Sequence, residues 1–283
     1  MRTILPERAS GAATISPEPG ALPPLPAASR RAEEAEVRAK RDSAAILPRV
    51  TWNANLRGFG MGEETLDPGC HTLTLFGVDA RAKAGAARRR LDLDAEMREI
   101  GMGRAIARDR SDAPDAQLSA CVGRPTTVEV GFAGSPPHAQ VLVAHAAWPL
   151  PDHLPTAWGS EVRGHMAHVL WTWHIRSLSR APVMLAQGGA GVTPIPMSIE
   201  PGACYLALVS VAEGAARSVA LRVDIGPREA FDDRGTEDEG AAVAFCAEGS
   251  SHGAARVEAR GTPLLVWGLA LYRLDAGIWE IPR

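Results

Sequence analysis

Short stretches in which apolar and polar residues alternate dominate the chain from residue 50 onward. They cover residues 71–78, 126–132 and 140–143 in the first half, and 205–211, 218–225, 254–259 and 263–272 in the second. Several of these stretches are rich in β-branched residues, and Gly, Pro and Asp separate them, which is typical of strands joined by turns. The pattern predicts an all-β protein built of β-sandwiches.

Residues 1–50 follow a different pattern. Seven prolines punctuate the segment and it holds few aromatic or β-branched residues, so it cannot bury enough apolar surface to offset its loss of entropy. Residues 29–41 favour a helix, because Glu34 precedes Arg38 and Glu36 precedes Lys40 by one helical turn. We expect a Pro-rich tail that carries a solvated, transient helix. The alternative is a helix that binds a partner.

The two halves of the chain repeat the same motifs in the same order. The matched segments are Leu66–Cys70 with Ile199–Cys204, Leu91–Asp94 with Leu221–Asp224, Asp109–Ser111 with Asp233–Gly235, Gln117–Cys121 with Ala242–Cys246, Thr127–Val130 with Arg256–Ala259, and Val141–Ala144 with Leu264–Trp267. A repeat of this length indicates a domain duplication. The alternative is a chance alignment of two strand-rich halves.

The repeat divides the chain into three parts. We predict a Pro-rich, partly helical tail at residues 1–50, one jelly-roll-like sandwich at residues 51–155 and a second at residues 156–283. Residues 169–175 alternate in polarity, with Trp171 and Trp173 on one side. They predict the first strand of the second sandwich.

Several of these motifs also suggest a family. Pro68-Gly69, a strand, Leu91–Asp94, then Asp109–Asp112 and a late Val128–Val130 strand are similar to bacterial prepeptidase C-terminal domains. The family's Gly-Thr-Tyr strand is replaced here by Arg124–Thr127, and the second copy lacks the paired aspartates. Those domains are jelly-roll-like secreted sandwiches attached to proteases and surface proteins. The resemblance implies an exported, accessory and non-catalytic module.

The charge of the chain and the length of its apolar runs favour neither nucleic acid nor a membrane. The formal net charge of −3 gives no global preference for nucleic acid or an anionic membrane. The longest apolar runs, such as residues 264–271, are far shorter than the roughly 20 residues that a transmembrane helix needs. The first residues also lack the apolar region of a signal peptide.

The four cysteines are distributed two to each copy, at matching places. None lies in a Cys-x-x-Cys spacing, so neither a zinc knuckle nor a thioredoxin-like site is expected. We predict the disulfides Cys70–Cys121 and Cys204–Cys246. Disulfides persist in oxidising compartments, so we expect an extracytoplasmic protein (periplasmic, surface-exposed or secreted), although no signal peptide is visible. The alternative is four reduced thiols in the cytoplasm.

Three groups of side chains are candidate binding sites, and no other cofactor is expected. They are His165, His168 and His174 for zinc, Asp109, Asp112 and Asp115 for calcium, and Trp158, Trp171 and Trp173 for a partner or sugar. Each group also has a plainer interpretation, as surface histidines, a solvated acidic loop and core tryptophans.

The sequence gives no convincing catalytic motif. Residues 249–253 read Gly-Ser-Ser-His-Gly, which matches Gly-x-Ser-x-Gly in letters but is typical of a turn, and no P-loop is present because residues 58–62 lack the Lys-Ser/Thr pair that would make their glycines a phosphate loop. We therefore expect a non-enzymatic, exported binding or structural protein whose partner is another envelope protein or a glycan. One alternative is a metal-dependent hydrolase that uses the histidine-rich residues 138–174. Another is a cytoplasmic subunit of a larger assembly.

Overall fold

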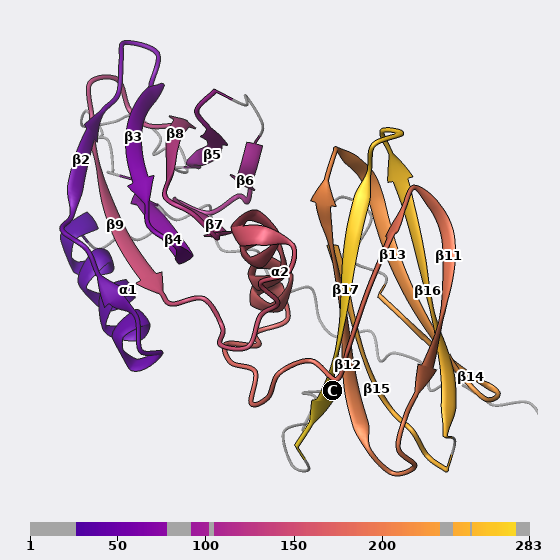
Figure 1. Ribbon diagram of the computed structural model, residues 1–283. Coiled ribbons are helices and arrows are strands. Elements are labelled where there is room, and N and C mark those ends of the chain that lie inside the picture. The colour runs from indigo at the N-terminus through magenta and orange to yellow at the C-terminus, as the bar shows by residue number, and fades with distance from the viewer. Residues whose placement is uncertain (1–26, 78–91, 102–104, 233–239, 250, 276–283) are drawn as a thin grey trace, which may run out of the picture.

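The computed structural model describes residues 27–77, 92–101, 105–232, 240–249 and 251–275, which form two β-sandwiches with a helix between them (Figure 1). The described part contains the helices α1 (Ala28–Arg41) and α2 (Gly159–Thr172). α1 packs on the first sandwich, and α2 contacts strands of both.

The described residues of the first sandwich form nine strands. They are β1 (Ala45–Ile46), β2 (Val50–Asn53), β3 (Gly60–Leu66), β4 (Gly69–Phe76), β5 (Asp94–Glu99), β6 (Ala105–Asp109), β7 (Asp115–Val122), β8 (Thr126–Ala133) and β9 (Gln140–Trp148). One sheet runs β9-β4-β7, with both β1 and β2 paired to β9. The other sheet has the order β3-β8-β5-β6.

Eight strands are seen in the described part of the second sandwich. They are β10 (Met184–Gly189), β11 (Gly191–Ser198), β12 (Cys204–Glu213), β13 (Ala216–Ile225), β14 (Arg228–Phe231), β15 (Gly240–Cys246), β16 (His252–Gly261) and β17 (Val266–Leu274). Its sheets have the orders β10-β17-β12-β15 and β11-β16-β13-β14.

Strand order is the same in the two sandwiches. Each strand from β2 to β9 occupies the place that the strand eight numbers later occupies in the second copy. Two antiparallel sheets interleaved in this way are a jelly roll. The predicted all-β architecture of two tandem sandwiches is therefore confirmed, and the shared topology supports the duplication.

Each sandwich encloses its own apolar core, because alternate residues of its strands point inward. Leu73 and Leu75 of β4 are fully buried in the first core. In the second, Ala207 and Val209 of β12 take the same positions, and Trp267 fills the space beside them. The alternation that predicted the strands thus also defines the two cores.

Both predicted disulfides form, and they occupy the same place in the two copies. Cys70 lies directly opposite Cys121 in the β4–β7 pair, and Cys204 lies directly opposite Cys246 in the β12–β15 pair. The Cα atoms are 3.9 Å apart in each pair. The bridged cysteines therefore provide reference positions from which equivalent residues of the two copies can be counted.

The strand register corrects one of the predicted matches between the halves. On its other side, Cys70 faces Trp148 of β9, while Cys204 faces Leu274 of β17. Counting back from these residues makes Val141 the counterpart of Trp267. The sequence match that paired Val141–Ala144 with residues 264–267 was out of step by three positions.

A second match is corrected by one position. An Asp109 carboxylate oxygen accepts a hydrogen bond from the backbone N–H of Gln117 (2.6 Å), and an Asp232 carboxylate oxygen accepts one from Ala242 (2.9 Å). Each amide stands four residues before the second cysteine of its copy. Asp232 is therefore the counterpart of Asp109, whereas Asp233, the predicted match, lies outside the described residues.

Helix α1 is docked on the first sandwich, so the expectation of a solvated, transient helix was wrong. Ala32 is fully buried in a small apolar cluster with Phe76 and Ala144. Arg31 forms an ion pair with Asp115 at 2.9 Å. The thin apolar face of the sequence misled the prediction, because alanines and ion pairs do the docking. Residues 1–26 of the predicted tail lie outside the described part.

Helix α2 occupies the place where the sequence predicted a strand at residues 169–175. Val162, Met166 and Leu170 recur at helical spacing and are buried. They pack in an apolar cluster that also contains Leu206 and Leu208 of the second sandwich. The helix is apolar on most of its surface because both sandwiches cover it. Its apolar residues therefore show no clear helical periodicity in the sequence. Residues 156–183 hold α2 and its flanking turns and add no strand to either sandwich.

Candidate binding groove

A groove with a volume of about 650 Å³ lies on the outer face of the first sandwich, between α1 and the end of α2. Strands β9, β4 and β7 provide its floor. One wall is α1, and residues 171–176 form the other. The groove exists because the two helices sit apart on one sheet.

Four uncharged polar side chains of β4 and β7 line the floor. The strand register places Thr72 opposite Ser119 and Thr74 opposite Gln117. The hydroxyl oxygens of Thr72 and Ser119 lie 2.9 Å apart in a hydrogen bond. These residues alternate with core residues such as Leu73, so they point away from the core. We call the four residues the polar floor.

The equivalent face of the second sandwich is apolar. Counted from the cysteines, the counterparts of Thr72 and Thr74 are Leu206 and Leu208, and both are fully buried. The other two polar positions are replaced by alanines. Helix α2 covers this face, and both leucines belong to the cluster between the sandwiches. The same face of the fold is a packing surface in one copy and a polar groove in the other.

Two tryptophans and an arginine form the wall opposite α1. The rings of Trp148 and Trp171 meet edge to face, with 4.7 Å between their centroids. The guanidinium carbon of Arg176 lies 3.3 Å from the centroid of the Trp171 ring. The indole N–H of Trp148 donates to the backbone carbonyl of Asp42 at 2.8 Å, which ties this wall to the end of α1.

Two ion pairs lie on the α1 side of the groove. Arg31 contacts Asp115, and Arg49 holds Glu36 through two hydrogen bonds of 2.6 and 2.9 Å. The Arg49 hydrogen bonds lower the pKa of Glu36. Burial raises the pKa of Asp115, and the charge of Arg31 opposes that effect. The groove as a whole has little net charge, because its lining sets Arg31, Arg38 and Arg176 against Glu34, Glu36, Asp42 and Asp115.

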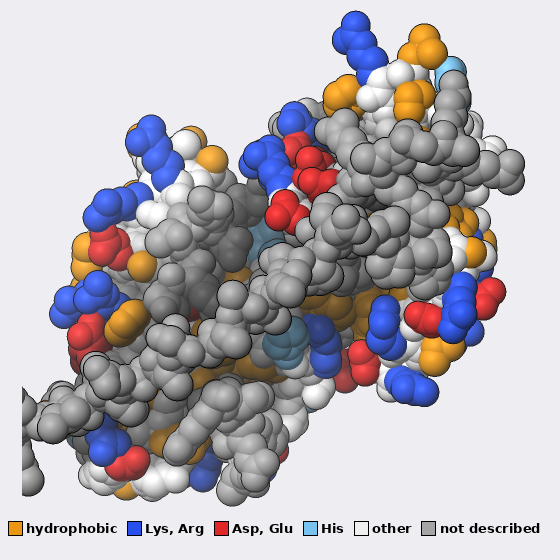
Figure 2. Space-filling view, turned by 180° about the vertical axis from the view of Figure 1, so that it is seen from behind, with side chains coloured by type: hydrophobic (Ala, Val, Ile, Leu, Met, Phe, Trp, Pro, Cys, Tyr) orange, Lys and Arg blue, Asp and Glu red, His pale blue; other side chains and the backbone are white. Residues whose placement is uncertain are grey.

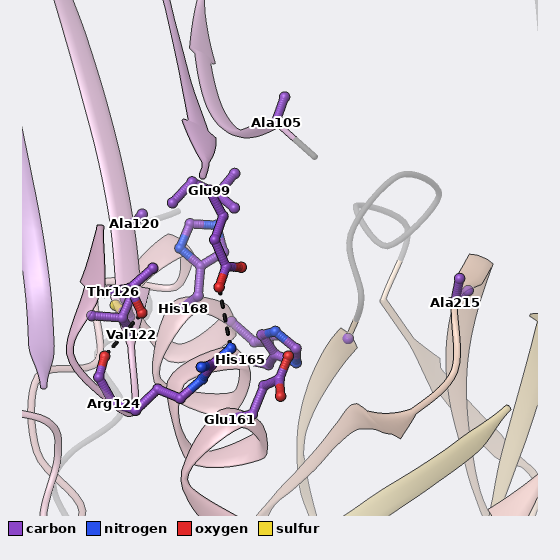
Figure 3. Close-up of a pocket in the computed structure, with 16 residues that line it drawn as sticks. Glu99, Ala105, Ala120, Val122, Arg124, Thr126, Glu161, His165, His168 and Ala215 are labelled. Carbon is purple, nitrogen blue, oxygen red and sulfur yellow. Dashed lines mark hydrogen bonds and ion pairs between the residues drawn. The ribbon is translucent and has the colours of Figure 1, made fainter. Parts of the chain in front are cut away.

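A second cleft, of about 400 Å³, lies between the two sandwiches beside α2 (Figure 3). Glu161, His165 and His168 project from α2 along it, and Ala215 lies on its far side. An ion pair of 3.1 Å between Arg124 and Glu99 closes the side formed by the first sandwich. The cleft separates the two copies over part of their interface.

The three histidines predicted to bind zinc are not brought together. His165 and His168 lie one turn apart on α2 and line the cleft of Figure 3, whereas His174 lines the groove. The described residues contain no group of three or more His, Cys, Asp or Glu that could hold a metal ion.

Two of the three aspartates predicted to bind calcium, Asp109 and Asp115, hold backbone groups of the fold instead. Asp109 accepts hydrogen bonds from the backbone N–H groups of Ser111 and Gln117. These backbone hydrogen bonds lower its pKa, although burial, the largest single influence, acts to raise it. Asp115 binds Arg31 and the N–H of Gly77. Asp112 is exposed on the turn between them.

The three predicted binding tryptophans lie in different surroundings. Trp171 lines the groove. Trp158 packs against Gly268 and donates a hydrogen bond of 3.3 Å to Gln187 in the second sandwich. Trp173 is partly buried against the cluster between the copies. Only Trp171 is therefore placed to contact a ligand in the groove.

The sequence prediction missed the polar floor, and the three tryptophans that it selected for binding did not include Trp148. A usable sign was present: residues 72 and 74 are threonines where the second copy has leucines. This difference can be recognised only when the copies are aligned on their cysteines, and its meaning only when α1 and α2 are known to flank this face of the first sandwich.

Fold and groove together define a tandem jelly-roll protein with a mixed polar and aromatic groove on its first copy. No protein-family model matches the chain, and no curated protein matches it. The resemblance to prepeptidase C-terminal domains therefore remains an expectation. In the part of the chain that the structure describes, no helix has the length and apolar character to cross a bilayer.

Solved structures are similar at a low level. The structure of Sulfolobus turreted icosahedral virus matches with a TM-score of 0.27 and 7% identity, over 82% of this chain and 90% of that chain. The PBSX exported protein XepA matches at 0.25 and 10%, over 81% and 86%. The major capsid protein P2 of bacteriophage PM2 matches at 0.22 and 9%, over 81% and 99%. Similarity at this level carries no information about function.

Proposed function

We propose that this protein is an exported, non-enzymatic binding module whose first sandwich holds a neutral glycan in the groove between α1 and α2. The observation that carries the proposal is the polar floor. Thr72 and Thr74 occupy the positions of buried leucines in the second copy. The fold is therefore compatible with apolar residues on this face, and its stability does not explain the threonines.

The chemistry of the groove favours a sugar. Hydroxyl and amide groups such as those of Thr74 and Gln117 exchange hydrogen bonds with sugar hydroxyls, and indole rings such as that of Trp148 pack on the apolar faces of pyranose rings. The paired charges of the α1 wall give no reason for a charged ligand. An envelope protein is the competing partner.

The disulfides support the exported part of the proposal. Two bridges that join directly opposed strand residues are typical of proteins in oxidising compartments. Mass spectrometry of alkylated, unreduced native protein tests this point. Four modified thiols in protein taken from its own cell would favour the cytoplasmic alternative.

The non-enzymatic part rests on the state of the charged groups. Asp115 and Glu36, two of the carboxylates at the groove, are held by arginines, which leaves neither placed as a free general acid or base. The described residues also give the hydrolase hypothesis no three-residue metal cluster.

A fluorescence titration tests the proposal, because Trp148 and Trp171 report directly on the groove. The probes are neutral hexasaccharides of the cello-, chito- and malto- series. We expect one series to change the emission saturably. The double variant Thr74→Leu/Gln117→Ala copies the residues of the second sandwich into the floor, and it should weaken that binding at least tenfold without loss of folding.

A matched control lies on the outer face of the other sheet. Thr65 and Thr127 are directly opposed and exposed there, and Thr65→Leu/Thr127→Ala should leave the titration unchanged. Absence of any response to the three series, or equal binding by the floor variant, would overturn the glycan proposal.

A further inference from the structure

A smaller cavity adjoins the groove at its tryptophan wall. Its volume is about 220 Å³. Four residues line both spaces: Asp42, Trp148, Trp171 and Arg176. Because the same four residues face both spaces, the groove and the smaller cavity meet at this wall. We call the smaller cavity the side pocket.

Apolar residues form most of the lining of the side pocket. Cys70, Pro151 and Ala167 line it and are buried, and the partly buried Ile175 adds to this lining. Protein interiors hold few voids larger than a water molecule, because the atoms around an empty space lose contacts with neighbours. A cavity of this size beside the groove is therefore better explained as a site for an apolar group than as ordinary packing.

Three polar residues complete the lining. Asp42 and Ser43 follow the end of α1 and are exposed. An N–H of the Arg176 guanidinium donates to the backbone carbonyl of Trp171 at 3.1 Å, which holds this group over the Trp171 ring. Burial lowers the pKa of Arg176, and the charge of Asp42 opposes this effect, so the two charged groups act on each other. The side pocket thus combines an apolar lining with hydrogen-bond acceptors and donors.

We propose that the side pocket takes the acetamido group of an N-acetylated sugar bound in the groove. The inference rests on the proposed glycan function and names its sugar class, the chito- series. An acetamido group has an apolar methyl, an N–H that donates and a carbonyl that accepts. Its methyl suits the apolar lining, its N–H suits the oxygens of Asp42 and Ser43, and its carbonyl suits the guanidinium of Arg176. The hydroxyl that a cello- sugar carries at the same carbon would leave the apolar lining empty.

The charges of the side pocket and of the surface favour an uncharged substituent. Asp42 and Arg176 have opposite charges, so an added charge of either sign would meet a like charge in the lining. Figure 2 shows basic and acidic side chains intermingled among the described residues on the face that it displays, so no field of one sign draws an ionised sugar to that face. An acetamido group is polar without charge, unlike the amino group of a deacetylated sugar.

Two hexasaccharides with the same backbone test the inference. Chitohexaose and cellohexaose have the same β-linked backbone and differ only in one substituent of each ring, which is acetamido in the first and hydroxyl in the second. Fluorescence titration of the full chain should show that chitohexaose binds at least tenfold more tightly. The reason is that a matched apolar group in a pocket is worth about 10–200-fold in discrimination.

A variant that fills the side pocket should remove this preference. Ala167→Met places a flexible side chain that suits irregular gaps into the pocket from α2. It should lower the affinity for chitohexaose to that for cellohexaose and leave the latter unchanged. Glu161→Met is the matched control, because it introduces the same side chain at an exposed position of the same helix that lines the cleft of Figure 3. It should leave both affinities unchanged, and urea unfolding checks that each variant folds.

Saturation-transfer NMR tests the same point on the original chain, without a variant. The acetyl methyl protons of chitohexaose should receive more saturation than the ring protons, because they enter the side pocket. Equal affinity for the two hexasaccharides, an unchanged preference in folded Ala167→Met, or weak saturation of the methyl protons would overturn this inference and leave the glycan proposal standing. Failure of all three sugar series to bind would overturn both.

Discussion

The imidazoles of His71 and His145 meet inside the first sandwich, with Nδ1 of His71 2.9 Å from Nε2 of His145. Nε2 of His71 lies 2.7 Å from the backbone carbonyl oxygen of Asp67. A carbonyl oxygen only accepts, so His71 donates through Nε2, its Nδ1 is the acceptor, and His145 donates to it. Both rings are almost fully buried, and the pair is neutral.

This pair predicts a loss of stability in mild acid. Burial lowers the pKa of His145 to about 4, with the neighbouring His71 adding to the effect, and burial also lowers the pKa of His71. The unfolded chain takes up these protons near pH 6.5, before the folded chain does. Stability is therefore complete above pH 6.5 and falls as the pH drops towards 4, by about 3 kcal/mol from His145 alone.

Urea unfolding at pH 7 and at pH 4.5 measures this loss. His145→Gln keeps an N–H donor for His71 but cannot take up a proton, so its stability should depend less on pH over this range. Carboxylates that titrate in the same window affect both proteins alike. A pH dependence that is the same in the variant and the original chain would show that the pair is not responsible.

The two disulfides should differ in their resistance to reduction. Cys70 and Cys121 are buried beneath α2, whereas Cys246 is exposed. Dithiothreitol should therefore open Cys204–Cys246 first in the folded protein, and peptide mapping of alkylated thiols over time would follow it. Simultaneous opening would contradict the prediction. Loss of either bridge by substitution with alanine should cost about 4 kcal/mol, since the bridged cysteines are 51 and 42 residues apart in sequence.

Much of the fold could be predicted because alternation records which strand residues face a core. The pairing of Cys70 with Cys121 could be predicted for a similar reason, as the copies repeat it at the same place. The helices could not. α1 docks through Ala32 and the ion pairs of Arg31 and Glu36, which resemble a solvated helix in sequence, and α2 is covered on two sides. The groove depends on where these helices lie, so it was hidden with them.

Leu208 and Thr74 occupy equivalent positions and should respond in opposite ways to exchange. Leu208 is fully buried beneath α2, so Leu208→Thr removes apolar contacts and buries a hydroxyl, which should cost about 2–4 kcal/mol. Thr74→Leu fills part of an open groove and should change stability by less than about 0.5 kcal/mol. If both substitutions lowered the free energy of unfolding equally, the two faces would be packing surfaces of the same kind, which would contradict the prediction.

Helix α2 approaches the first sandwich closely at Gly164, where its backbone meets the end of β7 and the residue that follows it. A Cβ on Gly164 would lie 2.5 Å from the backbone nitrogen of Gly123 and 2.9 Å from the carbonyl carbon of Val122. Gly164→Ala raises intrinsic helix propensity by about 1 kcal/mol, yet the clash is with backbone atoms that cannot move aside cheaply. The clash should outweigh the gain in helix propensity, so the free energy of unfolding measured in urea should fall by about 1–3 kcal/mol.

Gly131→Ala is the control, because a Cβ on Gly131 meets nothing within 4 Å and the substitution should be neutral or slightly stabilising. If Gly164→Ala matched this control, α2 would not be seated between the sandwiches as closely as the contacts of Gly123 and Gly164 require.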